Sequence, residues 1–393
     1  MRPIKLPQPP SGFSGLPDFF QGGVSSAIRR AVVIGNGFAG SENQSIGLVR
    51  AIGLFGRLAL YRVTRPRGGI NEWLHWLPVS LHKKLYFFMQ RIRGELGLQA
   101  TFKKQKAMAL SSETSGLSNI LEADAKHISK MARETFEKEG PLLVVASGRD
   151  TISVASSIKR LAPENVFVVQ EQIPWFLRRW ITPCESPGKN VVLTVGALHQ
   201  ADSAALRSAA STWHDELAPV PKPLLVVNVG GPTKNCLYGA DLANHLAARL
   251  QNVLWSCGTV RISFSRRTPE KVSDILVREF TGNPKVFIWD GKGSNPHMGH
   301  LAWADAFVIT ADSVSMLSEA CSTGKPVYVV GAERCTWKFS DFQKSLQDRG
   351  AVRPFTGKED ISDNWSYPPL NDNIEAASCV NASLAKRGWS IHT

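Results

Sequence analysis

The chain alternates between short runs of apolar, mostly β-branched residues and longer stretches whose apolar positions recur at helical spacing. Short apolar runs are typical of strands buried on both faces, as in parallel sheets. The clearest unit spans residues 305–331, where two such runs flank a helical pattern that ends at Gly324 and Pro326. Runs of this kind predict strands at 29–34, 58–63, 141–146, 165–170, 191–195, 223–229, 260–264, 286–289, 307–310 and 327–330.

The alternation of strand and helix occurs twice, and each time it opens on a strand that enters a glycine turn. Repeated units of this kind predict parallel sheets covered by helices. We therefore predict the α/β class, with two Rossmann-like domains facing a cleft and a C-terminal helix that crosses back over the first domain. The predicted parts are a flexible Pro/Gly-rich tail (1–28), the first domain (29–196), the second domain (197–356), and a linker with the crossing helix (357–393).

The first glycine turn has the spacing GxGxxG between a predicted strand and a predicted helix. In this context glycine lets the backbone approach a phosphate or a sugar closely. No acidic residue follows at the end of the next predicted strand, so a nicotinamide dinucleotide site is disfavoured. A turn that needs glycine for steric reasons alone explains the pattern equally well. The candidate ligand-binding positions are Gly35, Asn36, Gly37, Gly40, Ser41, Asn43 and Gln44.

A second candidate site lies in the clearest strand-helix-strand unit. Parallel sheets bind ligands at the carboxyl ends of their strands, which here is the turn 310–315. Ser313 and Ser315 at the start of a helix suit an anion, and Glu319 suits sugar hydroxyls. Alternatively, Asp312 or Ser313 only caps the helix and Glu319 is a solvated helix residue. The residues alone favour this simpler interpretation.

A basic amphipathic helix is predicted from residue 79 to 96. Its Lys83, Lys84, Arg91 and Arg93 are candidate contacts for an anionic membrane or an acidic partner. More often such a helix covers a sheet, and we favour that arrangement from the pattern.

The net charge of +13 is concentrated at one end of the chain. The first 110 residues hold sixteen Lys and Arg against four Asp and Glu, so the remainder is close to neutral. This asymmetry points to an anionic partner surface, such as phospholipid headgroups, an acidic protein or nucleic acid.

Composition sets further limits on the class of protein. Hydrophobic residues make up 43% and charged residues 20% of the chain, as in globular proteins. No apolar run approaches the ~20 residues of a membrane-spanning helix, and the early prolines do not fit a signal or transit peptide. We therefore expect a cytosolic protein. Its six scattered cysteines predict reduced, mostly buried thiols and no metal site.

Several segments resemble the plant elongated-mitochondria fission proteins, a family within the glycosyltransferase-B-like superfamily. The superfamily resemblance rests on the turn 35–44 and on Ser313, Glu319, Gly324 and Pro326. The closer resemblance covers nearly the whole chain and rests on residues 29–37, 64–66, 68–69, 71–78, 150–153, 299–303, 310–315 and 364–372.

The resemblance implies a peripheral protein on the cytosolic face of the outer mitochondrial membrane that recruits a dynamin-related GTPase for fission. It also implies an ancestral nucleotide-sugar cleft with the glutamate on the ribose, without implying a transferase activity. One departure stands out, because the family carries a further strand and loop where Gln170 here runs directly into residues 171–174. We expect a shortened form whose first domain lacks a sheet element and part of the cleft lip.

Two functional hypotheses follow. We interpret the chain as an adaptor whose basic first quarter docks on anionic lipid or an acidic partner, and which requires no cofactor. The alternative is a glycosyltransferase-B-type enzyme or sugar-nucleotide-binding protein with its ligand at the second candidate site. Catalysis would need a general base near the first glycine turn, where Glu42 is the only acid. His75 and His300 depend on the fold, so no catalytic residue is assigned. Nucleic acid is not an expected partner, because the basic region contains no recognised binding module.

Overall fold

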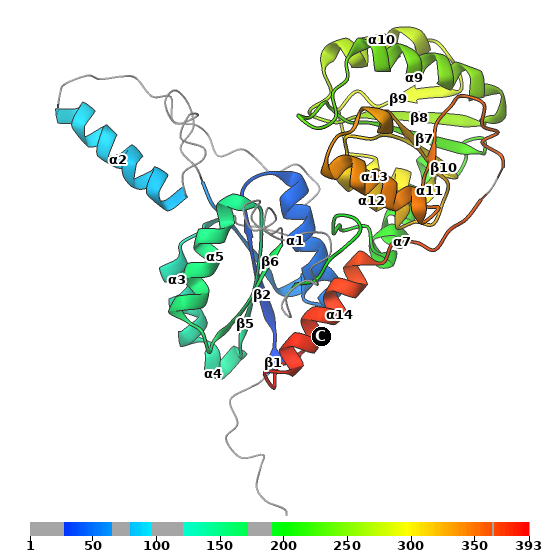
Figure 1. Cartoon of the computed structure of the whole chain (residues 1–393). Coiled ribbons are helices and arrows are strands. Elements are labelled where there is room, and N and C mark those ends of the chain that lie inside the picture. Colours follow the sequence, from blue (N-terminus) through cyan, green and yellow to red (C-terminus); the bar gives the residue numbers. More distant parts are fainter. Residues whose placement is uncertain (1–26, 65–78, 96–120, 172–190, 364, 393) are drawn as a thin grey trace, which may run out of the picture.

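A computed structural model describes residues 27–64, 79–95, 121–171, 191–363 and 365–392. Two parallel sheets stand side by side, each with helices on both faces (Figure 1). We call each sheet with its covering helices a domain. The α/β class with parallel sheets, predicted from the sequence, is confirmed.

The first domain is built on five parallel strands in the order β4-β3-β2-β5-β6. Alternate residues of the central strand β2 point to opposite faces, so Ala31 and Val33 join one core and Val32 and Ile34 join the other. Helices α1 and α14 cover the first of these faces, and α3 and α5 cover the second (Figure 1). The strands are β2 (Arg30–Gly35), β3 (Leu58–Arg62), β4 (Leu121–Glu122), β5 (Leu142–Ser147) and β6 (Val166–Glu171); the helices are α1 (Ala39–Ile52), α3 (Ala125–Glu134), α4 (Phe136–Glu139) and α5 (Ile152–Leu161).

The second domain has six parallel strands in the order β12-β11-β10-β7-β8-β9. Helices α9 and α10 cover one face, and α11, α12 and α13 cover the other. The strands are β7 (Leu224–Val229), β8 (Thr259–Phe264), β9 (Val286–Ile288), β10 (Ala306–Thr310), β11 (Val327–Val330) and β12 (Arg353–Pro354); the helices are α9 (Ala240–Val253), α10 (Glu270–Phe280), α11 (His297–Trp303), α12 (Val314–Cys321) and α13 (Lys338–Asp348). Helices α7 (Ser203–Thr212) and α8 (His214–Leu217) lie between the two domains in the sequence.

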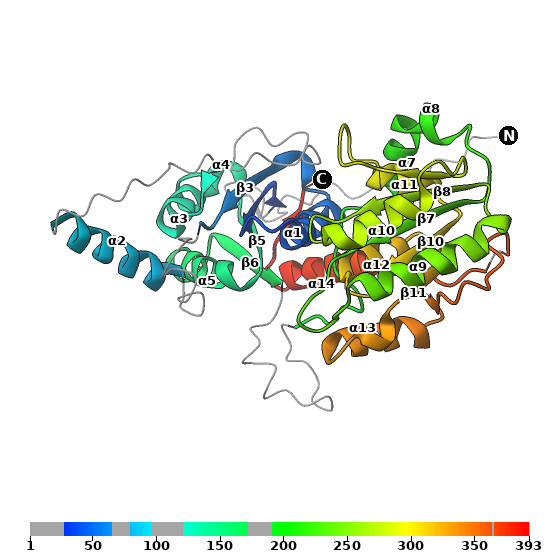
Figure 2. The same cartoon turned by 90° about the horizontal axis from the view of Figure 1, so that it is seen from above.

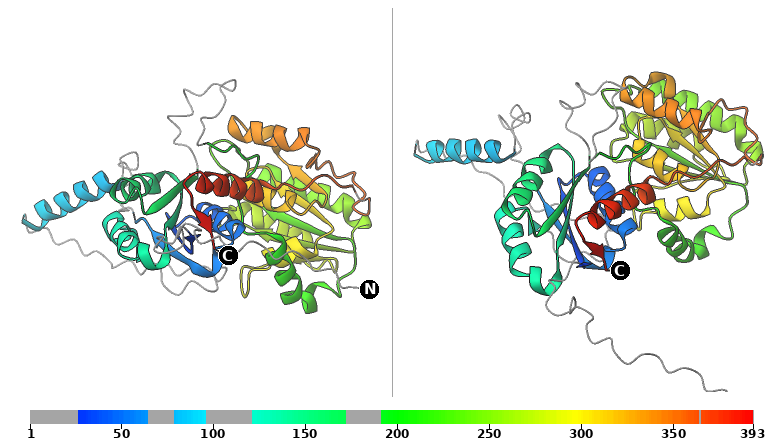
Figure 3. Two further views of the ribbon diagram at one scale, coloured as in Figure 1. Left: turned by 90° about the horizontal axis from the view of Figure 1, so that it is seen from below. Right: turned by 60° about the horizontal axis from the view of Figure 1, so that its bottom comes forward.

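The C-terminal helix α14 (Asp372–Ala385) returns to the first domain, as predicted. It lies against α1 (Figure 3). Its Ala376, Ala377, Val380 and Leu384 are buried in the same core as α1. The last strand, β13 (Ser390–Ile391), then pairs in parallel with β1 (Ala27–Ile28). The first domain is therefore assembled from both ends of the chain.

Two predicted boundaries differ from the structure. The predicted tail 1–28 lies largely outside the described residues, but Ala27 and Ile28 form strand β1, and Ile28 is fully buried. The predicted strand at 191–195 is wrong. This segment is an irregular connection in which Val192 and Leu193 are exposed. The N–H of Val195 bonds to the Asp372 carboxylate instead of to a sheet neighbour.

Helix α2 (Val79–Glu95) begins beside β4, where Lys83 pairs with Glu122, and its later turns project away from both sheets (Figure 2). Its existence was predicted, but the favoured arrangement, a helix covering a sheet, is wrong. Leu81, Phe87 and Phe88 have 51–64% of their surface exposed. Within the described residues, no helix is long and apolar enough to cross a membrane.

Candidate functional site

The first glycine turn is filled by a carboxylate of its own helix. Glu42 in α1 accepts a hydrogen bond from the Gly37 N–H at 2.9 Å. Its other interactions come from Arg62 at the end of β3, which donates to both carboxylate oxygens at 2.7 and 2.6 Å. Only 7% of the Glu42 side chain is exposed. Glu42 is thus fully engaged in structure and is not placed to act as a free general base.

Two of the three glycines in this turn are required, each for a different steric reason. A Cβ on Gly35 would lie 2.3 Å from Glu42 Oε1, so only glycine leaves room for the buried carboxylate. Gly37 has φ +81°, a left-handed conformation that favours glycine. Gly35 therefore makes room for the Glu42 carboxylate and Gly37 allows the turn, so both glycines have the steric explanation that the sequence left open.

The glycine turn of the second domain is filled in a corresponding way. Asp312, after β10, accepts from the Gly231 N–H at 2.9 Å and from the hydroxyls of Tyr238 and Thr310 at 3.0 and 2.7 Å. Arg267 adds an ion pair at 3.2 Å. Burial raises the pKa of Asp312, although these hydrogen bonds and the Arg267 charge oppose the shift.

Both filled turns lie at the topological switch points of their sheets. The chain leaves β7 and β10 toward opposite edges of the second sheet, and it leaves β2 and β5 toward opposite edges of the first. Crevices at such points commonly bind ligands. Here the amide of Gly37 and that of Gly231 already donate to carboxylates of the same chain. Each carboxylate occupies the position that suits a bound anion.

The N-terminus of α12 is organised as the sequence suggested. Ser313 is the N-cap and accepts from the Met316 N–H, so Ser313 rather than Asp312 caps this helix. One turn further, Glu319 is buried and is bonded to His297 Nε2 at 2.7 Å. Burial alone would raise the pKa of Glu319, but the charge and hydrogen bond of His297 outweigh burial and lower this pKa. The interpretation of Glu319 as a solvated helix residue is therefore wrong.

A cleft of about 1220 Å³ opens between the domains. Its walls include Asn43 and Arg50 of α1 on one side and His297 and Glu319 on the other. Arg50 is bound by Asp202 at 2.8 Å, and Asn43 accepts from Gln200 at 2.8 Å. The cleft that the sequence predicted is present, and its wall includes two predicted site residues, Asn43 and Glu319.

The two predicted sites converge at one end of this region. A Cβ on Gly40 would lie 3.7 Å from Ser315 Oγ, so the starts of α1 and α12 face each other. The remaining predicted side chains make local contacts. Asn36 accepts from the Phe38 N–H and packs against Gly148, the Ser41 carbonyl accepts from Ser147, and Gln44 donates to the Gly40 carbonyl. These contacts place the turn 36–44 within the framework of the first domain.

The segments that join the domains are held by a hydrogen-bonded clasp around residues 195–199. Asp372 accepts from the N–H groups of Val195 and Gly196, both at 2.8 Å. Ser318 Oγ accepts from the Ala197 N–H at 2.9 Å, and Asn373 Oδ1 accepts from the His199 N–H at 3.1 Å. On the other side, a Cβ on Gly47 of α1 would lie 2.3 Å from the His199 carbonyl oxygen. These contacts fix the geometry of the cleft.

Of the candidate bases raised by the sequence, Glu42 is held by Arg62 and His300 is buried. His300 is buried, neither ring nitrogen has a partner among the described residues, and burial lowers its pKa to about 3. His75 lies outside the described residues. A carboxyl that the sequence did not single out, Glu171, is buried at the end of β6 and accepts from Ser45 Oγ at 3.1 Å. Burial raises its pKa to about 8.

The predicted basic positions lie on the projecting helix α2. Lys84 and Arg91 are exposed, and Lys83 pairs with Glu122 at 2.5 Å. Arg93 belongs to the same helix, but its side chain lies outside the described part of the structure.

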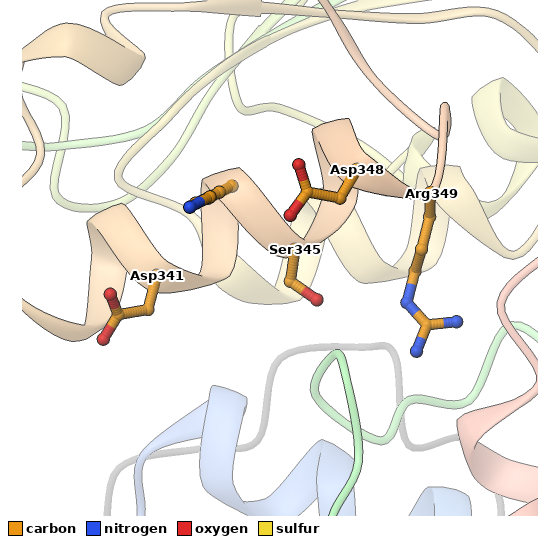
Figure 4. Close-up of a pocket in the computed structure, with 5 residues that line it drawn as sticks. Asp341, Ser345, Asp348 and Arg349 are labelled. Atoms are coloured by element: carbon orange, nitrogen blue, oxygen red, sulfur yellow. The ribbon is translucent and has the colours of Figure 1, made fainter. Parts of the chain in front are cut away.

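A smaller hollow of about 430 Å³ lies against α13 (Figure 4). Its lining comes from one helix and the residue after it: Asp341, Lys344, Ser345, Asp348 and Arg349. Because no second element contributes to the lining, we do not assign a function to this hollow. Among the described residues, no cluster of His, Cys, Asp and Glu is placed to hold a metal ion.

Sequence reasoning missed several residues that organise these sites. Arg62 follows Glu42 by twenty positions, and Arg267 precedes Asp312 by forty-five, so no local pattern connects either pair. The only available signal was that Arg62 lies near the end of a predicted strand and Arg267 follows one, at the sheet edge where the glycine turns lie. His297 gave no comparable signal.

Comparison with known families decides the relationship. The model of the family described as mitochondrial fission ELM1 matches residues 39–384. The chain belongs to this family. Its relative in Arabidopsis thaliana, mitochondrial fission protein ELM1, is 58% identical, and the alignment covers 100% of both chains. That alignment has 427 positions, 34 more than the 393 residues of this chain. This agrees with a form shorter than that relative.

A partial sequence match and a solved structure of similar fold extend the comparison for this ELM1-family chain. The uncharacterized protein RP120 of Rickettsia prowazekii is 32% identical over 182 residues, which is 45% of this chain and 51% of that protein. The solved structure of UDP-GlcNAc 2-epimerase from Methanocaldococcus jannaschii aligns over 90% of this chain and 99% of its own, with TM-score 0.50 and 13% identity. This likeness supports the glycosyltransferase-B-like fold.

Proposed function

We propose that this protein acts in mitochondrial fission as a peripheral adaptor. It binds the cytosolic face of the outer mitochondrial membrane and recruits a dynamin-related GTPase there. Membership of the ELM1 family supports a role in mitochondrial fission. The membrane step rests on one structural observation, the projecting helix α2.

Helix α2 combines exposed apolar and basic side chains. Beyond Lys83 it stands away from the sheets (Figure 2). Phe87 and Phe88 are 64% and 62% exposed, and Lys84 and Arg91 are exposed beside them. Burying a phenylalanine contributes about 1.5–3 kcal/mol, and each basic residue contributes about 1 kcal/mol at an anionic surface. Together these residues are sufficient for reversible membrane binding.

The filled glycine turns favour a scaffold over a transferase. Glu42 and Asp312 accept the amide hydrogen bonds that an enzyme of this fold would offer to a ligand. Each carboxylate is also held by an arginine. Displacing either one would leave buried partners without their hydrogen bonds.

Vesicle flotation tests the proposal. The protein should float with phosphatidylcholine vesicles that contain phosphatidylserine and much less with phosphatidylcholine alone. The double variant Lys84→Glu/Arg91→Glu should bind at least about tenfold more weakly, as should Phe87→Ser/Phe88→Ser. The matched control is Lys271→Glu/Arg278→Glu, which reverses two exposed charges at the same seven-residue spacing on α10. Equal loss in the control, or no dependence on lipid charge, contradicts the role of α2.

The recruitment step needs a second component in the same assay. A purified dynamin-related GTPase should float with the vesicles only when this protein is present. Flotation of the GTPase at the same level without the protein, or no flotation with it, argues against the adaptor. The same assay should be run with a form into which the further strand and loop of the family, absent here after Gln170, are inserted.

Binding of a nucleotide sugar is the second candidate function, favoured by the Glu319–His297 pair in the cleft wall. Calorimetry with a panel of nucleotide sugars tests it. Binding that Glu319→Ala abolishes and Glu375→Ala, at an exposed position of α14, preserves would establish a working site. Absence of binding across the panel favours a scaffold.

A further inference from the structure

Two cysteines meet behind the glycine turn of the second domain. Cys236 lies in the loop after β7, and Cys335 lies in the loop after β11. Their sulfur atoms share a hydrogen bond at 2.9 Å, although 99 positions separate them in the sequence. Cys236 is 1% exposed and Cys335 is 8% exposed.

The backbone around the two cysteines holds them directly opposite each other. They form an antiparallel bridge, and residues paired in this way have Cα atoms about 4.5–5.5 Å apart. A disulfide needs Cα atoms about 4.4–6.8 Å apart. Cys236 also bridges to Thr233, and the Thr336 N–H donates to the Asn235 carbonyl at 2.7 Å. The loops therefore hold the pair in register for a covalent bond.

We propose that Cys236 and Cys335 are an oxidisable dithiol, which a hydroperoxide converts into a reversible disulfide. This modification site lies beside Asp312, since Cys335 Sγ is 3.7 Å from the carbonyl oxygen of Ala311. The bond would tie the loop after β7 to the loop after β11.

The two sulfurs have different roles in this reaction. Cys335 is the more exposed, and the hydrogen bond with Cys236 lowers the pKa of Cys335 and raises that of Cys236. Because Cys335 is the more exposed sulfur, it is the one that the hydroperoxide reaches first, and it reacts as the thiolate.

The reaction balances in two steps. The Cys335 thiolate attacks the hydroperoxide, an S–O bond forms, the O–O bond breaks, and the leaving alkoxide takes up a proton. Cys236 then attacks the Cys335 sulfenic acid; the S–S bond forms, the S–O bond breaks, and the released hydroxide leaves as water with the thiol proton. Two thiols lose two electrons to the hydroperoxide, which becomes an alcohol and water.

Other buried cysteines have chemistry that makes them unreactive. Burial raises the pKa of Cys257 to about 11 and that of Cys321 to about 12. Both therefore remain thiols at neutral pH, and each donates to a backbone carbonyl, Val253 and Ala351 respectively, whereas Cys335 bonds to another cysteine. The exposed Cys379 lies on α14 and serves as the matched control.

Peptide mapping of the full chain tests the proposal. The reduced protein is treated with hydrogen peroxide, free thiols are alkylated, and the chain is digested with trypsin. We expect peptide 235–249 linked to peptide 335–338, and loss of this species after dithiothreitol. The midpoint of thermal unfolding should rise by roughly 5–10 °C on oxidation and return on reduction, as for a disulfide that closes a long loop.

Variants sharpen the test. Cys379→Ser should keep both the linked peptide and the thermal shift, whereas Cys236→Ser and Cys335→Ser should lose both. If either of these two serine variants fails to fold, the wild-type peptide map alone decides. Peroxide-treated wild type with both cysteines still alkylated, or with Cys335 as sulfinic acid and no linked peptide, overturns the proposal.

Discussion

Arg62 donates to both carboxylate oxygens of Glu42, and this fork fixes the first glycine turn. The Glu42 side chain is only 7% exposed, and the Arg62 guanidinium is the counter-charge beside it. The relationship extends across the fold, because Arg62 ends β3 while Glu42 lies in α1.

Removing the arginine should therefore destabilise the first domain strongly. Arg62→Ala leaves a buried carboxylate without its counter-charge, and we expect a loss of about 3–5 kcal/mol in the free energy of unfolding. Denaturant titration measures it. Arg57→Ala, at an exposed position five residues earlier, should change stability by less than about 0.5 kcal/mol. Similar small effects for both variants would show that water replaces Arg62.

Asp312 offers a parallel test in the second domain. In Asp312→Asn an amide NH2 group replaces one of the two carboxylate oxygens. The NH2 group can only donate hydrogen bonds, whereas both oxygens of Asp312 accept them. Either the Gly231 N–H or the hydroxyls of Thr310 and Tyr238 then lose an acceptor. We expect a loss of about 1–3 kcal/mol by denaturant titration. Asp215→Asn, on an exposed side chain, is the control; equal stability of both variants contradicts the assigned hydrogen bonds.

The clasp between the domains predicts a sensitive glycine. Alanine normally improves a helix interior by about 1 kcal/mol over glycine. In Gly47→Ala, however, the new Cβ would lie 2.3 Å from the backbone oxygen of His199. We expect the steric conflict to prevail, with a net loss of about 1–3 kcal/mol and a lower melting temperature. Gly56→Ala meets nothing within 4 Å and should be nearly neutral. If Gly47→Ala stabilises the protein, the backbone around His199 moves to accommodate the new methyl group.

Glu171 predicts a pH dependence of stability. Its folded pKa of about 8 lies above the ordinary value of 4.5, so the folded state holds the proton more tightly than the unfolded chain. The penalty for ionisation is absent below about pH 4.5, grows as the pH rises, and is complete above about pH 8. Glu171→Gln should match the wild type near pH 4.5 and exceed it by roughly 3–5 kcal/mol at pH 9. Denaturant titrations at both pH values check this, and a constant difference would assign the effect to packing.

The sequence was informative wherever one segment decides its own structure. The apolar runs of β7 and β10 are buried on both faces, and the cap, apolar positions and stop signals of α12 are all local. The run 191–195 shows the limit of this signal. It has the same composition as the true strands, but Val192 and Leu193 are exposed and the backbone bonds to Asp372 at the far end of the chain.

The candidate site was less accessible to sequence reasoning because its essential contacts are long-range. Glycine spacing located both turns, but whether a turn binds a ligand or one of the chain's own carboxylates depends on Arg62 and Arg267, which lie far away in sequence. Helix α13 was missed for a different reason. Its buried Phe342 and Leu346 are at helical spacing, but they lie among polar residues and give only a weak pattern.

The pairing of β1 with β13 imposes an order on the folding of the two domains during synthesis. Ile28 is paired with Ile391, and α14 completes the core around α1. Both α14 and β13 follow the second domain in the sequence, so they leave the ribosome after it. The second domain, continuous in sequence from β7 to β12, is translated in full while the first still lacks a wall of its core. Assembly of the first domain therefore ends after the second is complete, which reverses the usual N-to-C order of folding during translation.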